Sequence, residues 1–235
     1  MNNIMSKYSS RIKDIAHMID HTLLKANASD EQIKRLCEEA IKYGFYSVCV
    51  NPSKVAIASK FLIDKDVHVC AVIGFPLGAS TKLVKAFEIK DAVANGADEV
   101  DVVVNIGAIK SGNWDEVDND IKLVIDSVES SIVVKLILET CMLTDTEKIK
   151  VCQIAKNRRA DFVKTSTGFG SYGATVEDVR LLRSVVGENM GVKASGGIKN
   201  VHDTIEMINA GATRIGTSSG IAIIKELEQI DFIYK

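Results

Sequence analysis

Short apolar runs alternate along the chain with longer stretches in which apolar residues recur at the spacing of a helix face. The short runs are rich in valine and isoleucine and predict buried strands, and the longer stretches predict amphipathic helices. Regular alternation of the two is typical of βαβ units, whose strands lie parallel in one sheet. The predicted strands are residues 21–24, 47–50, 67–74, 99–105, 133–139, 162–167, 192–197 and 214–218.

Capping residues mark the ends of several predicted helices. Ser29 followed by Gln32, and Thr175 followed by Asp178, have the spacing with which a side chain caps the first turn of a helix. Pro52 suits a first-turn position, where its missing N–H is not needed. Glycines that suit a left-handed cap follow four of the helices: Gly44, Gly96, Gly187 and Gly211.

Eight evenly spaced strand–helix units in 235 residues predict an α/β fold, a single (β/α)8 TIM barrel that forms one domain over residues 1–235. Residues 12–19 carry a further apolar stripe and predict an extra N-terminal helix at the amino-terminal end of the barrel. A doubly wound open sheet is the alternative, but it needs a switch point and usually has fewer strands. No low-complexity tract or linker divides the chain.

Composition and charge narrow the classes of function. Hydrophobic residues make up 46% of the chain and charged residues 26%, which suits one globular domain with a sizeable core. The formal net charge of -2, with acids and bases interspersed, provides no broad basic field, so we expect no nucleic-acid partner and no membrane partner. The first residues lack the apolar core of a signal peptide, so we expect a cytoplasmic protein.

Cysteine and histidine positions form no recognisable disulfide or metal pattern. The five cysteines are an odd set without a CxxC pair, and we interpret them as reduced thiols in or near the core. His17 and His21 have the spacing of two zinc ligands on a helix, but Met18 stands where a zinc peptidase needs glutamate. We therefore expect no metal in the functional site.

Three predicted strands carry a lysine among apolar neighbours. Lys135, Lys164 and Lys193 are 29 residues apart, one strand–helix unit each, which predicts similar heights on adjacent strands. A single strand lysine commonly reaches solvent at the end of the sheet, but three in step predict converging ammonium groups. Burial and a neighbouring cation would lower the pKa of such an amine from about 10.4 and make it a nucleophile for carbonyl groups. The spacing does not choose among the three.

The fourth predicted strand has a carboxylate in its middle. Asp101 alternates with valines, so its side chain is either exposed or buried against a partner, and a parallel sheet covered on both faces favours burial beside a lysine. A carboxylate beside amines supplies acid–base chemistry. Asp98 and Glu99 are nearer the preceding loop and are predicted to be solvated or capping residues.

Small residues stand at the ends of the seventh and eighth strands, where this barrel commonly binds phosphate. Gly196 and Gly197 follow the seventh strand, and Gly216, Ser218 and Ser219 stand at the end of the eighth. Glycines let backbone N–H groups approach an anion, and the start of the next helix adds partial positive charge. Each cluster alone would commonly be a turn, but the pair predicts a phosphate site.

Residues 168–173 match the glycine pattern of a dinucleotide-binding turn. That interpretation requires an acidic residue at the end of the next strand to hold the ribose, and residues 193–196 read Lys-Ala-Ser-Gly instead. We therefore interpret these glycines as an active-site loop in which Gly168 can also face phosphate, and we expect no nicotinamide cofactor.

Ordered motifs over nearly the whole chain resemble those of the deoxyribose-phosphate aldolases. The motifs are IDHTLL at residues 19–24, VCVNP at 48–52, GFPLG at 74–78, GADEVD at 96–101, ETC at 139–141, FVKTSTGF at 162–169, VKASGGI at 192–198 and GTSSG at 216–220. So many matches in the same order make the resemblance highly specific.

The resemblance implies a reaction and a role for each matching residue. Lys164 of the KTSTG motif would form a Schiff base, and Lys193 and Asp101 would move protons. The implied reaction is the reversible cleavage of 2-deoxy-D-ribose 5-phosphate into D-glyceraldehyde 3-phosphate and acetaldehyde, without metal or organic cofactor, in a homodimer or larger homo-oligomer. The resemblance places Asp20, Thr22 and Cys49 along the pocket and Gly168, Gly196, Gly197, Gly216, Ser218 and Ser219 around the phosphate, and the lysine spacing adds Lys135 to the pocket.

Three positions depart from the family pattern or stay open. Arg159 stands where the family usually has a glycine, at the end of a predicted helix. Tyr172 replaces a commonly small residue in the active-site loop and could narrow access for the acceptor aldehyde. Tyr234 is a candidate for the terminal tyrosine that reaches the active site in some relatives.

Two other functions stay open at the level of sequence. Another lysine-dependent aldolase of the same barrel type would use a ketose phosphate or a keto acid as its donor. A noncatalytic barrel that senses sugar phosphates would need no nucleophile, and the strand lysines with Asp101 argue against it.

Overall fold

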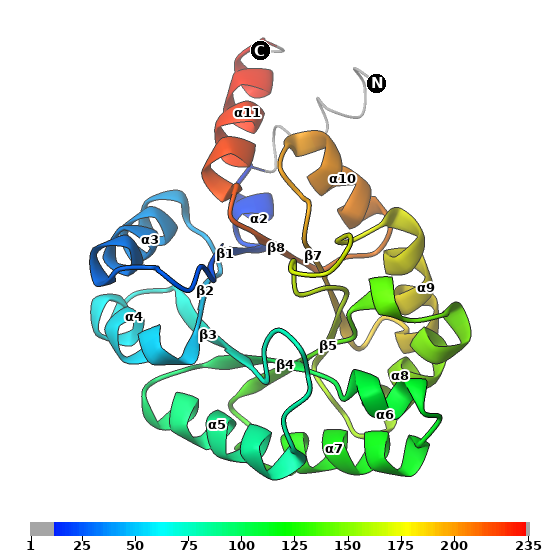
Figure 1. The fold of residues 1–235 in the computed structure, drawn as a ribbon. Coiled ribbons are helices and arrows are strands. Elements are labelled where there is room, and N and C mark those ends of the chain that lie inside the picture. The colour runs from blue at the N-terminus through cyan, green and yellow to red at the C-terminus, as the bar shows by residue number, and fades with distance from the viewer. Residues whose placement is uncertain (1–11, 234–235) are drawn as a thin grey trace.

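Eight parallel strands close into a barrel in the computed structural model, which describes residues 12–233 (Figure 1). Each strand pairs with its neighbour in sequence, and β1 (Ile19–Leu23) pairs with β8 (Arg214–Thr217). This closure confirms the predicted (β/α)8 barrel over the open, doubly wound sheet. The assignment of all residues 1–235 to one domain stays a prediction.

Strands inside and helices outside alternate along the chain. The remaining strands are β2 (Ser47–Val50), β3 (His68–Ile73), β4 (Glu99–Val103), β5 (Val133–Ile137), β6 (Phe162–Lys164) and β7 (Gly191–Ser195). The helices are α2 (Ile12–Ala16), α3 (Asp30–Tyr43), α4 (Val55–Leu62), α5 (Lys82–Ala94), α6 (Ile106–Lys110), α7 (Trp114–Asp126), α8 (Asp145–Asn157), α9 (Val176–Val186), α10 (Val201–Asn209) and α11 (Gly220–Ile233). Short 3₁₀ turns, Pro52–Lys54 and Thr140–Met142, precede α4 and α8.

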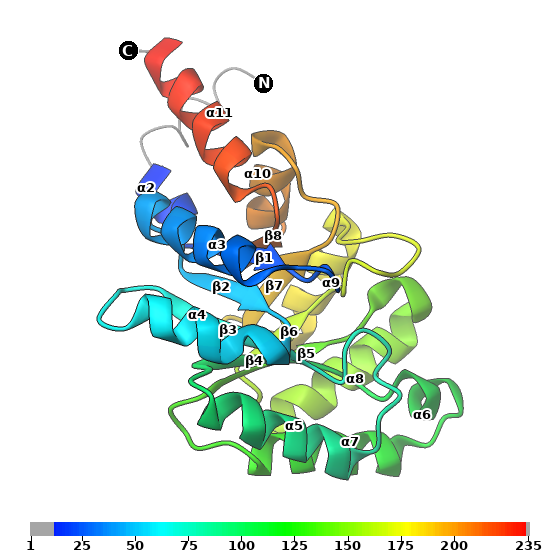
Figure 2. The same ribbon diagram turned by 60° about the vertical axis from the view of Figure 1, so that its left-hand side comes forward.

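The extra N-terminal helix is shorter than the sequence predicts. Helix α2 ends at Ala16 and β1 begins at Ile19, so Ile19 is a strand residue and not part of a helix over residues 12–19. Its carbonyl accepts the N–H of Tyr46, a strand-to-strand bond that the local apolar stripe does not reveal. Helix α2 packs against α11, and both lie on the same side of the barrel (Figure 2).

Several strands end earlier than predicted at the edge where the site lies. Strands β4, β5 and β6 end at Val103, Ile137 and Lys164, two or three residues before the predicted ends. Beyond β6, the hydroxyl of Thr165 bonds both backbone groups of Ser195. Side chains therefore replace part of the strand pairing at this edge and turn the chain into the loops.

The predicted caps at Ser29, Thr175 and Gly44 form, whereas α5 and α10 are capped by Asn95 and Ala210, each followed by the predicted glycine with positive φ. Ser29 is the centre of a complete capping box at the start of α3, and Thr175 accepts the N–H of Asp178 at the start of α9. Gly44 closes α3 in the left-handed conformation. Gly187 has φ 76° and ψ -165°, so it ends α9 in an extended conformation with positive φ and not as the predicted left-handed cap.

The main hydrophobic core lies between the barrel and the surrounding helices, where side chains such as Ile33, Val100 and Leu182 are buried. A small separate cluster contains Cys49 and Cys70.

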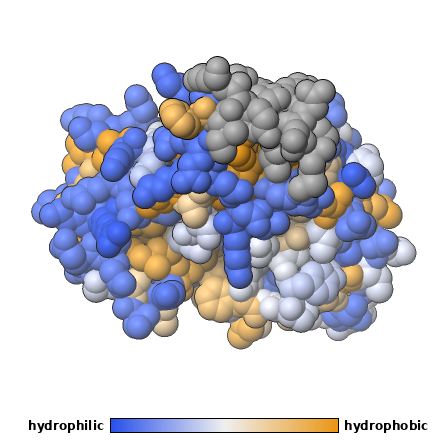
Figure 3. Space-filling model, turned by 90° about the horizontal axis from the view of Figure 1, so that it is seen from above, coloured by the Kyte–Doolittle hydropathy of each residue, from blue (hydrophilic) through white to orange (hydrophobic). Residues whose placement is uncertain are grey.

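Among residues 12–233, no helix combines the length and apolar character needed to cross a membrane. On the face shown in Figure 3, hydrophobic residues form separate patches between hydrophilic ones. Because neighbouring strand residues alternate between faces, the barrel interior is left for the polar residues of the strands.

Arg159, in place of the family's usual glycine, has a left-handed backbone conformation. Its φ is 62° just after α8, and the residue is exposed. This conformation costs a residue with a Cβ about 1–2 kcal/mol, whereas glycine adopts it freely. We therefore expect Arg159→Gly to raise the free energy of unfolding by about 1 kcal/mol, measured by urea denaturation.

Arg158→Gly is the matched control for that variant. Arg158 has φ -85° and ψ -1°, a right-handed conformation that gains nothing from glycine. Its Nε also donates to Asp118 Oδ1 at 2.8 Å. This variant should lower the free energy of unfolding, and a destabilised Arg159→Gly would contradict the backbone argument.

Candidate active site

A cavity of about 350 Å³ opens at the carboxyl ends of the strands. The loops after β1, β6, β7 and β8 form its walls, at the end of the barrel where this fold carries its functional groups. Eight of the thirteen site residues predicted from sequence line it: Thr22, Lys164, Gly168, Gly196, Gly197, Gly216, Ser218 and Ser219. The other five do not line it and are buried inside the barrel: Asp20, Cys49, Asp101, Lys135 and Lys193.

Asp101 is the hub of the buried polar side chains. Its Oδ2 accepts from Lys164 Nζ and from Lys193 Nζ, each at 2.7 Å. Its Oδ1 accepts from Lys135 Nζ at 2.9 Å and from the Cys70 thiol at 3.1 Å. The three strand lysines therefore converge, as the spacing predicts, and they do so on one carboxylate.

The three lysines do not lie at one height. Lys164 is opposite Lys193 in the pairing of β6 with β7, but Lys135 is opposite Phe162. Lys135 therefore lies two residues closer to the amino-terminal end of the barrel. Strands of a closed barrel are staggered, and the stagger moves equal sequence positions to different heights. The prediction of similar heights is wrong for Lys135.

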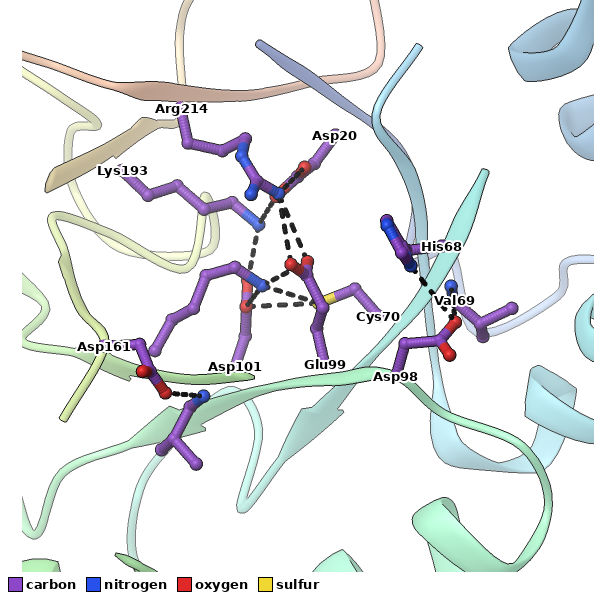
Figure 4. Close-up of polar contacts among 12 residues, drawn as sticks. Asp20, His68, Val69, Cys70, Asp98, Glu99, Asp101, Asp161, Lys193 and Arg214 are labelled. Carbon is purple, nitrogen blue, oxygen red and sulfur yellow. Dashed lines mark hydrogen bonds and ion pairs between the residues drawn. The ribbon is translucent and has the colours of Figure 1, made fainter. Parts of the chain in front are cut away.

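Asp20 and Glu99 connect the lysines to Arg214 (Figure 4). Asp20 Oδ2 lies 2.5 Å from Lys193 Nζ, an ion pair without a well-aligned hydrogen bond, and its Oδ1 lies 2.9 Å from Arg214 Nη1. Glu99 Oε2 lies 2.7 Å from Lys135 Nζ and 3.2 Å from Arg214 Nη1. These contacts close a ring of alternating charges, the charged ring: Arg214, Asp20, Lys193, Asp101, Lys135, Glu99 and again Arg214.

Glu99 contradicts the sequence prediction, whereas Asp98 agrees with it. The side chain of Glu99 is 1% exposed and lies inside the barrel, so it is neither solvated nor capping. The carboxylate of Asp98 is half-exposed, accepts the N–H of Val69 and lies near His68. Because side chains alternate between the two faces of a strand, adjacent acids can have opposite environments.

The carboxylates reverse the predicted effect on lysine acidity. Burial alone would lower the pKa of Lys193 and of Lys135, but Asp101 and the other nearby carboxylates outweigh burial and raise both pKa values. Burial would raise the pKa of Asp101, but the three lysines hold it well below its usual range. Lys135 and Lys193 therefore keep their protons, and the predicted lowering is wrong for these two.

One group of potential metal ligands exists among residues 12–233: Cys49, Cys70 and Asp101. The two thiols lie on adjacent strands, and a hydrogen bond between them lowers the pKa of Cys49. Three lysines already bind the carboxylate, and their charge opposes a metal cation there. His21, part of the histidine pair noted in the sequence, is buried and bonds Glu39 at 2.9 Å.

The predicted phosphate loops have backbone conformations that require glycine. Gly168, Gly196 and Gly197 have φ values of 87°, 85° and 82°, a region in which other residues are strained. Helix α11 begins directly after Ser218 and Ser219, so its first N–H groups and its positive end lie beside them. Both features suit an anion at this end of the cavity.

The loop after β6 is held in place by Glu139. This carboxylate accepts both the backbone N–H and the hydroxyl of Thr167. A Cβ on Gly170 would come within 2.6 Å of a cysteine sulfur, and one on Gly173 within 2.1 Å of the Gly196 carbonyl oxygen. Close packing therefore accounts for two glycines of the dinucleotide-like pattern.

An aromatic residue of the same loop lines the cavity, but it is Phe169 and not Tyr172. The ring of Phe169 stacks edge-on against Phe75, with 5.3 Å between the ring centroids. Tyr172 is 49% exposed and does not line the cavity, so the structure gives no support to a narrowing role. Tyr234 lies outside the described residues.

Sequence reasoning missed several residues of the site. Lys199 lines the cavity beside the phosphate loops, and its place directly after the Gly-Gly-Ile stretch could have indicated it. No local signal indicated Arg214, because a single arginine at the start of a strand is common at a barrel end. The site residues missed include Lys25, Cys70, Glu99, Glu139, Lys199 and Arg214.

Comparison with known proteins gives one consistent family. Residues 15–226 match the family model described as DeoC/LacD family aldolase. The chain is 58% identical over 212 residues to the deoxyribose-phosphate aldolase of Geobacillus sp. (strain WCH70), with 90% of this chain and 95% of that protein covered. It is 58% identical over 224 residues to that of Caldanaerobacter subterraneus subsp. tengcongensis, with 94% and 97% covered.

A solved structure of similar fold agrees with these sequence relatives. The deoxyribose phosphate aldolase from Aeropyrum pernix, described as having a unique tetrameric structure, matches with a TM-score of 0.87 and 32% identity. The match covers 97% of this chain and 98% of that chain.

Proposed function

The chain belongs to the DeoC/LacD family of aldolases, and from this premise we propose that it cleaves 2-deoxy-D-ribose 5-phosphate reversibly through a Schiff base on Lys164. The products are D-glyceraldehyde 3-phosphate and acetaldehyde. Relatives 58% identical over most of the chain carry the name deoxyribose-phosphate aldolase. The observation that carries the proposal is the position of Lys164, which lines the cavity and contacts the charged ring.

Charge balance distinguishes Lys164 from the other two strand lysines. The charged ring holds three cations, Arg214, Lys193 and Lys135, and three anions, Asp20, Asp101 and Glu99, so it is neutral without Lys164. Among the carboxylates of the described residues, Lys164 pairs with Asp101 alone, and its side chain reaches the cavity although it is only 3% exposed. The free amine is the form that attacks a carbonyl carbon.

The reaction follows from an amine at this position. In the cleavage direction, the Lys164 amine attacks the aldehyde carbon of the open-chain sugar, and loss of water gives an iminium ion. Loss of the C3 hydroxyl proton then lets the C2–C3 bond break, and its electron pair moves into the iminium to give an enamine. D-Glyceraldehyde 3-phosphate leaves, the enamine takes a proton on carbon, and hydrolysis releases acetaldehyde and the free lysine. The iminium is the electron sink, so this sequence of steps uses no metal or organic cofactor.

Asp101 and Lys193 are the proposed proton-handling pair. Asp101 Oδ2 accepts from Lys164 and from Lys193, so both groups lie beside the reacting amine. A water molecule bound by them would take the C3 hydroxyl proton and return a proton to the enamine.

The phosphate end of the substrate is assigned to the two glycine–serine loops. Lys199 and Lys25 line the same cavity and supply full positive charges near these loops. Backbone N–H groups and the start of α11 would bind the phosphate oxygens, and the lysines would add charge-assisted bonds. The residues assigned are Gly168, Gly196, Gly197, Gly216, Ser218 and Ser219.

The proposal extends to assembly and location. A homodimer or larger homo-oligomer is supported by the relative from Aeropyrum pernix, which is described as tetrameric. A cytoplasmic location, with small sugar phosphates and acetaldehyde as the partners, is supported by the composition of the chain.

A panel of substrates and donors tests the proposal. We expect release of D-glyceraldehyde 3-phosphate from 2-deoxy-D-ribose 5-phosphate, measured in a coupled assay. For 2-deoxy-D-ribose without phosphate, kcat/KM should be about 100-fold lower, because charge-assisted phosphate contacts contribute about 1.5–3 kcal/mol each. Activity confined to dihydroxyacetone phosphate or pyruvate as donor would indicate another lysine-dependent aldolase. Binding without turnover would indicate a sugar-phosphate sensor.

A further inference from the structure

Within residues 12–233, the side chain of Glu139 bonds only to the chain segments that follow β5 and β6. Its Oε1 accepts the N–H of Thr167 at 3.3 Å and the thiol of Cys141 at 3.8 Å. Its Oε2 accepts the Thr167 hydroxyl. The side chain is buried, and no lysine, arginine or histidine of the described residues forms an ion pair with it. Glu139 therefore serves the loop after β6 and not the charged ring.

The backbone of Glu139 has the left-handed conformation, with φ 55° and ψ 64°. This conformation is unfavourable for a residue with a Cβ, and it persists where the surrounding structure fixes it, commonly at ligand sites. The next residue is held by a strand-like bond, from the N–H of Thr140 to the carbonyl of Thr165 at 2.9 Å. The unfavourable conformation therefore brings the Glu139 carboxylate to the loop after β6.

Thr167 passes this contact on to the backbone of the loop. Its hydroxyl donates to Glu139 and accepts the N–H of Phe169 at 3.0 Å. Glu139 thereby fixes the direction of the hydroxyl and, with it, the turn from Thr167 to Phe169. Gly168, the middle residue of this turn, lines the cavity, and its N–H has no acceptor among the described residues. The turn therefore keeps the N–H of Gly168 free for a ligand.

A turn of the same kind follows β8. The Thr217 hydroxyl donates to the Ile198 carbonyl at 2.7 Å and accepts the N–H of Ser219 at 2.9 Å. Ser218, the middle residue, also lines the cavity, and its N–H likewise has no acceptor in the described part of the chain. The two turns differ in the group that fixes the hydroxyl, which is a backbone carbonyl after β8 and the side chain of Glu139 after β6. A substitution can therefore remove that group from the β6 turn alone.

We propose that Glu139 is a positioning residue for phosphate binding: through Thr167 it holds the N–H of Gly168 ready for the phosphate group of the substrate. This inference rests on the phosphate site of the proposed function. A loop with several glycines has many accessible conformations. Fixing the loop before the substrate arrives removes part of the entropic cost of binding. The affinity for phosphate should therefore depend on Glu139, whereas the chemistry at Lys164, which contacts Asp101, should not.

The kinetics of Glu139→Met test this inference, because methionine keeps a stem of similar length and removes the acceptor. We expect KM for 2-deoxy-D-ribose 5-phosphate and the inhibition constant of inorganic phosphate to rise at least about tenfold, the effect of one charge-assisted hydrogen bond. Because the bond is made equally in the bound substrate and the transition state, kcat should stay near the wild-type value. For 2-deoxy-D-ribose without phosphate, kcat/KM should also stay near that of the wild type. Equal losses for the two sugars, or a lower melting temperature alone, would overturn the inference.

Glu147→Met is the matched control, because Glu147 makes the same pair of contacts elsewhere. At the start of α8 its carboxylate accepts the N–H of Thr144 at 2.7 Å and the Thr144 hydroxyl at 3.1 Å. It also pairs with Lys110 and does not line the cavity. This variant should lower the melting temperature and leave KM and the inhibition constant of phosphate unchanged. Equal rises in the two variants would contradict a specific role for Glu139.

The variants Thr167→Val and Thr167→Ser decide the question should Glu139→Met fail to fold. Valine has the shape of threonine without the hydroxyl, so it should raise KM for the phosphorylated sugar as Glu139→Met does. Serine keeps the hydroxyl and should restore the affinity, and equal KM values in these two variants would overturn the inference. A wild type without cleavage would refute the proposed function itself. A wild type that cleaves the sugar and is inhibited by phosphate, beside an unchanged Glu139→Met, would refute only the role of Glu139.

Discussion

Lys164→Met is expected to abolish covalent capture of acetaldehyde and to lower kcat for cleavage of 2-deoxy-D-ribose 5-phosphate on the order of 10⁴-fold or more. Neither of the other two strand lysines can replace it, because Lys135 and Lys193 keep their protons beside the carboxylates. The fold should survive the change, because Asp101 retains three of its four partners. Methionine also fills a space similar to that of the lysine stem.

The measurement is the mass of tryptic peptides after borohydride reduction in the presence of acetaldehyde. The wild type should carry the two-carbon adduct on the peptide that contains Lys164. Lys60→Met, at an exposed position of α4, is the matched control and should keep both label and turnover. An adduct on a peptide without Lys164, or near-normal turnover in Lys164→Met, would refute the assignment of the nucleophile.

The second large effect is expected at the hub. Asp101→Asn should lower kcat by about 10²–10⁴-fold, because the acid–base group beside Lys164 is lost. It should also lower the free energy of unfolding by about 3–5 kcal/mol, because buried lysines lose the carboxylate on which they converge. Steady-state kinetics measure the change in kcat, and urea denaturation at about pH 7 measures the change in the free energy of unfolding.

The stability effect of Asp101 has a definite pH dependence. The folded pKa of Asp101 is held well below its usual range, against the opposing effect of burial. Its carboxylate therefore stabilises the fold above the unfolded pKa of about 3.9, and this contribution is lost as the pH falls from there toward the folded pKa. The difference in unfolding free energy between wild type and Asp101→Asn should be complete at neutral pH and shrink in acid.

Asp98→Asn is the matched control for the hub. Asp98 directly precedes the same strand, and its side chain is half-exposed. Within the described residues, its carboxylate accepts one hydrogen bond, from the backbone N–H of Val69 at 2.8 Å, and lies near His68. Its replacement should cost about 1 kcal/mol of stability and leave kcat near that of the wild type. Equal losses in the two variants would show that the network around Asp101 has no special role.

Local patterns predicted the elements of the fold well, because the information lies within each segment. The capping box at Ser29 and the cap at Thr175 were readable from spacing alone, and both form. The boundary between α2 and β1 was not readable, because Ile19 is drawn into the barrel by bonds to partners distant in the chain. The spacing also did not reveal that Gly187 leaves α9 with an extended ψ of -165°.

The candidate site was predicted in part, and each error has its own physical cause. The alternation of Asp101 with valines correctly placed a carboxylate among lysines, because period two fixes which face a strand residue takes. The height of Lys135 depends on the stagger between strands, whereas the burial of Glu99 follows from the same period of two that places Asp101 inside the barrel. The pKa values of Lys135 and Lys193 depend on the number of carboxylates near them. That number cannot be read from the sequence of one strand, because the carboxylates come from different strands.

By itself the sequence determined an eight-stranded barrel, three strand lysines with a carboxylate, and the glycine–serine loops that suit phosphate. Only the resemblance of the KTSTG motif to that of a known family identified Lys164 as the nucleophile among those lysines. The tertiary structure alone showed the charged ring, and with it the physical ground for Lys164: Lys135 and Lys193 each have a second carboxylate, and Lys164 has none among residues 12–233. The reason is that the balance depends on pairs such as Asp20 and Arg214, which are 194 residues apart and meet only when the barrel closes.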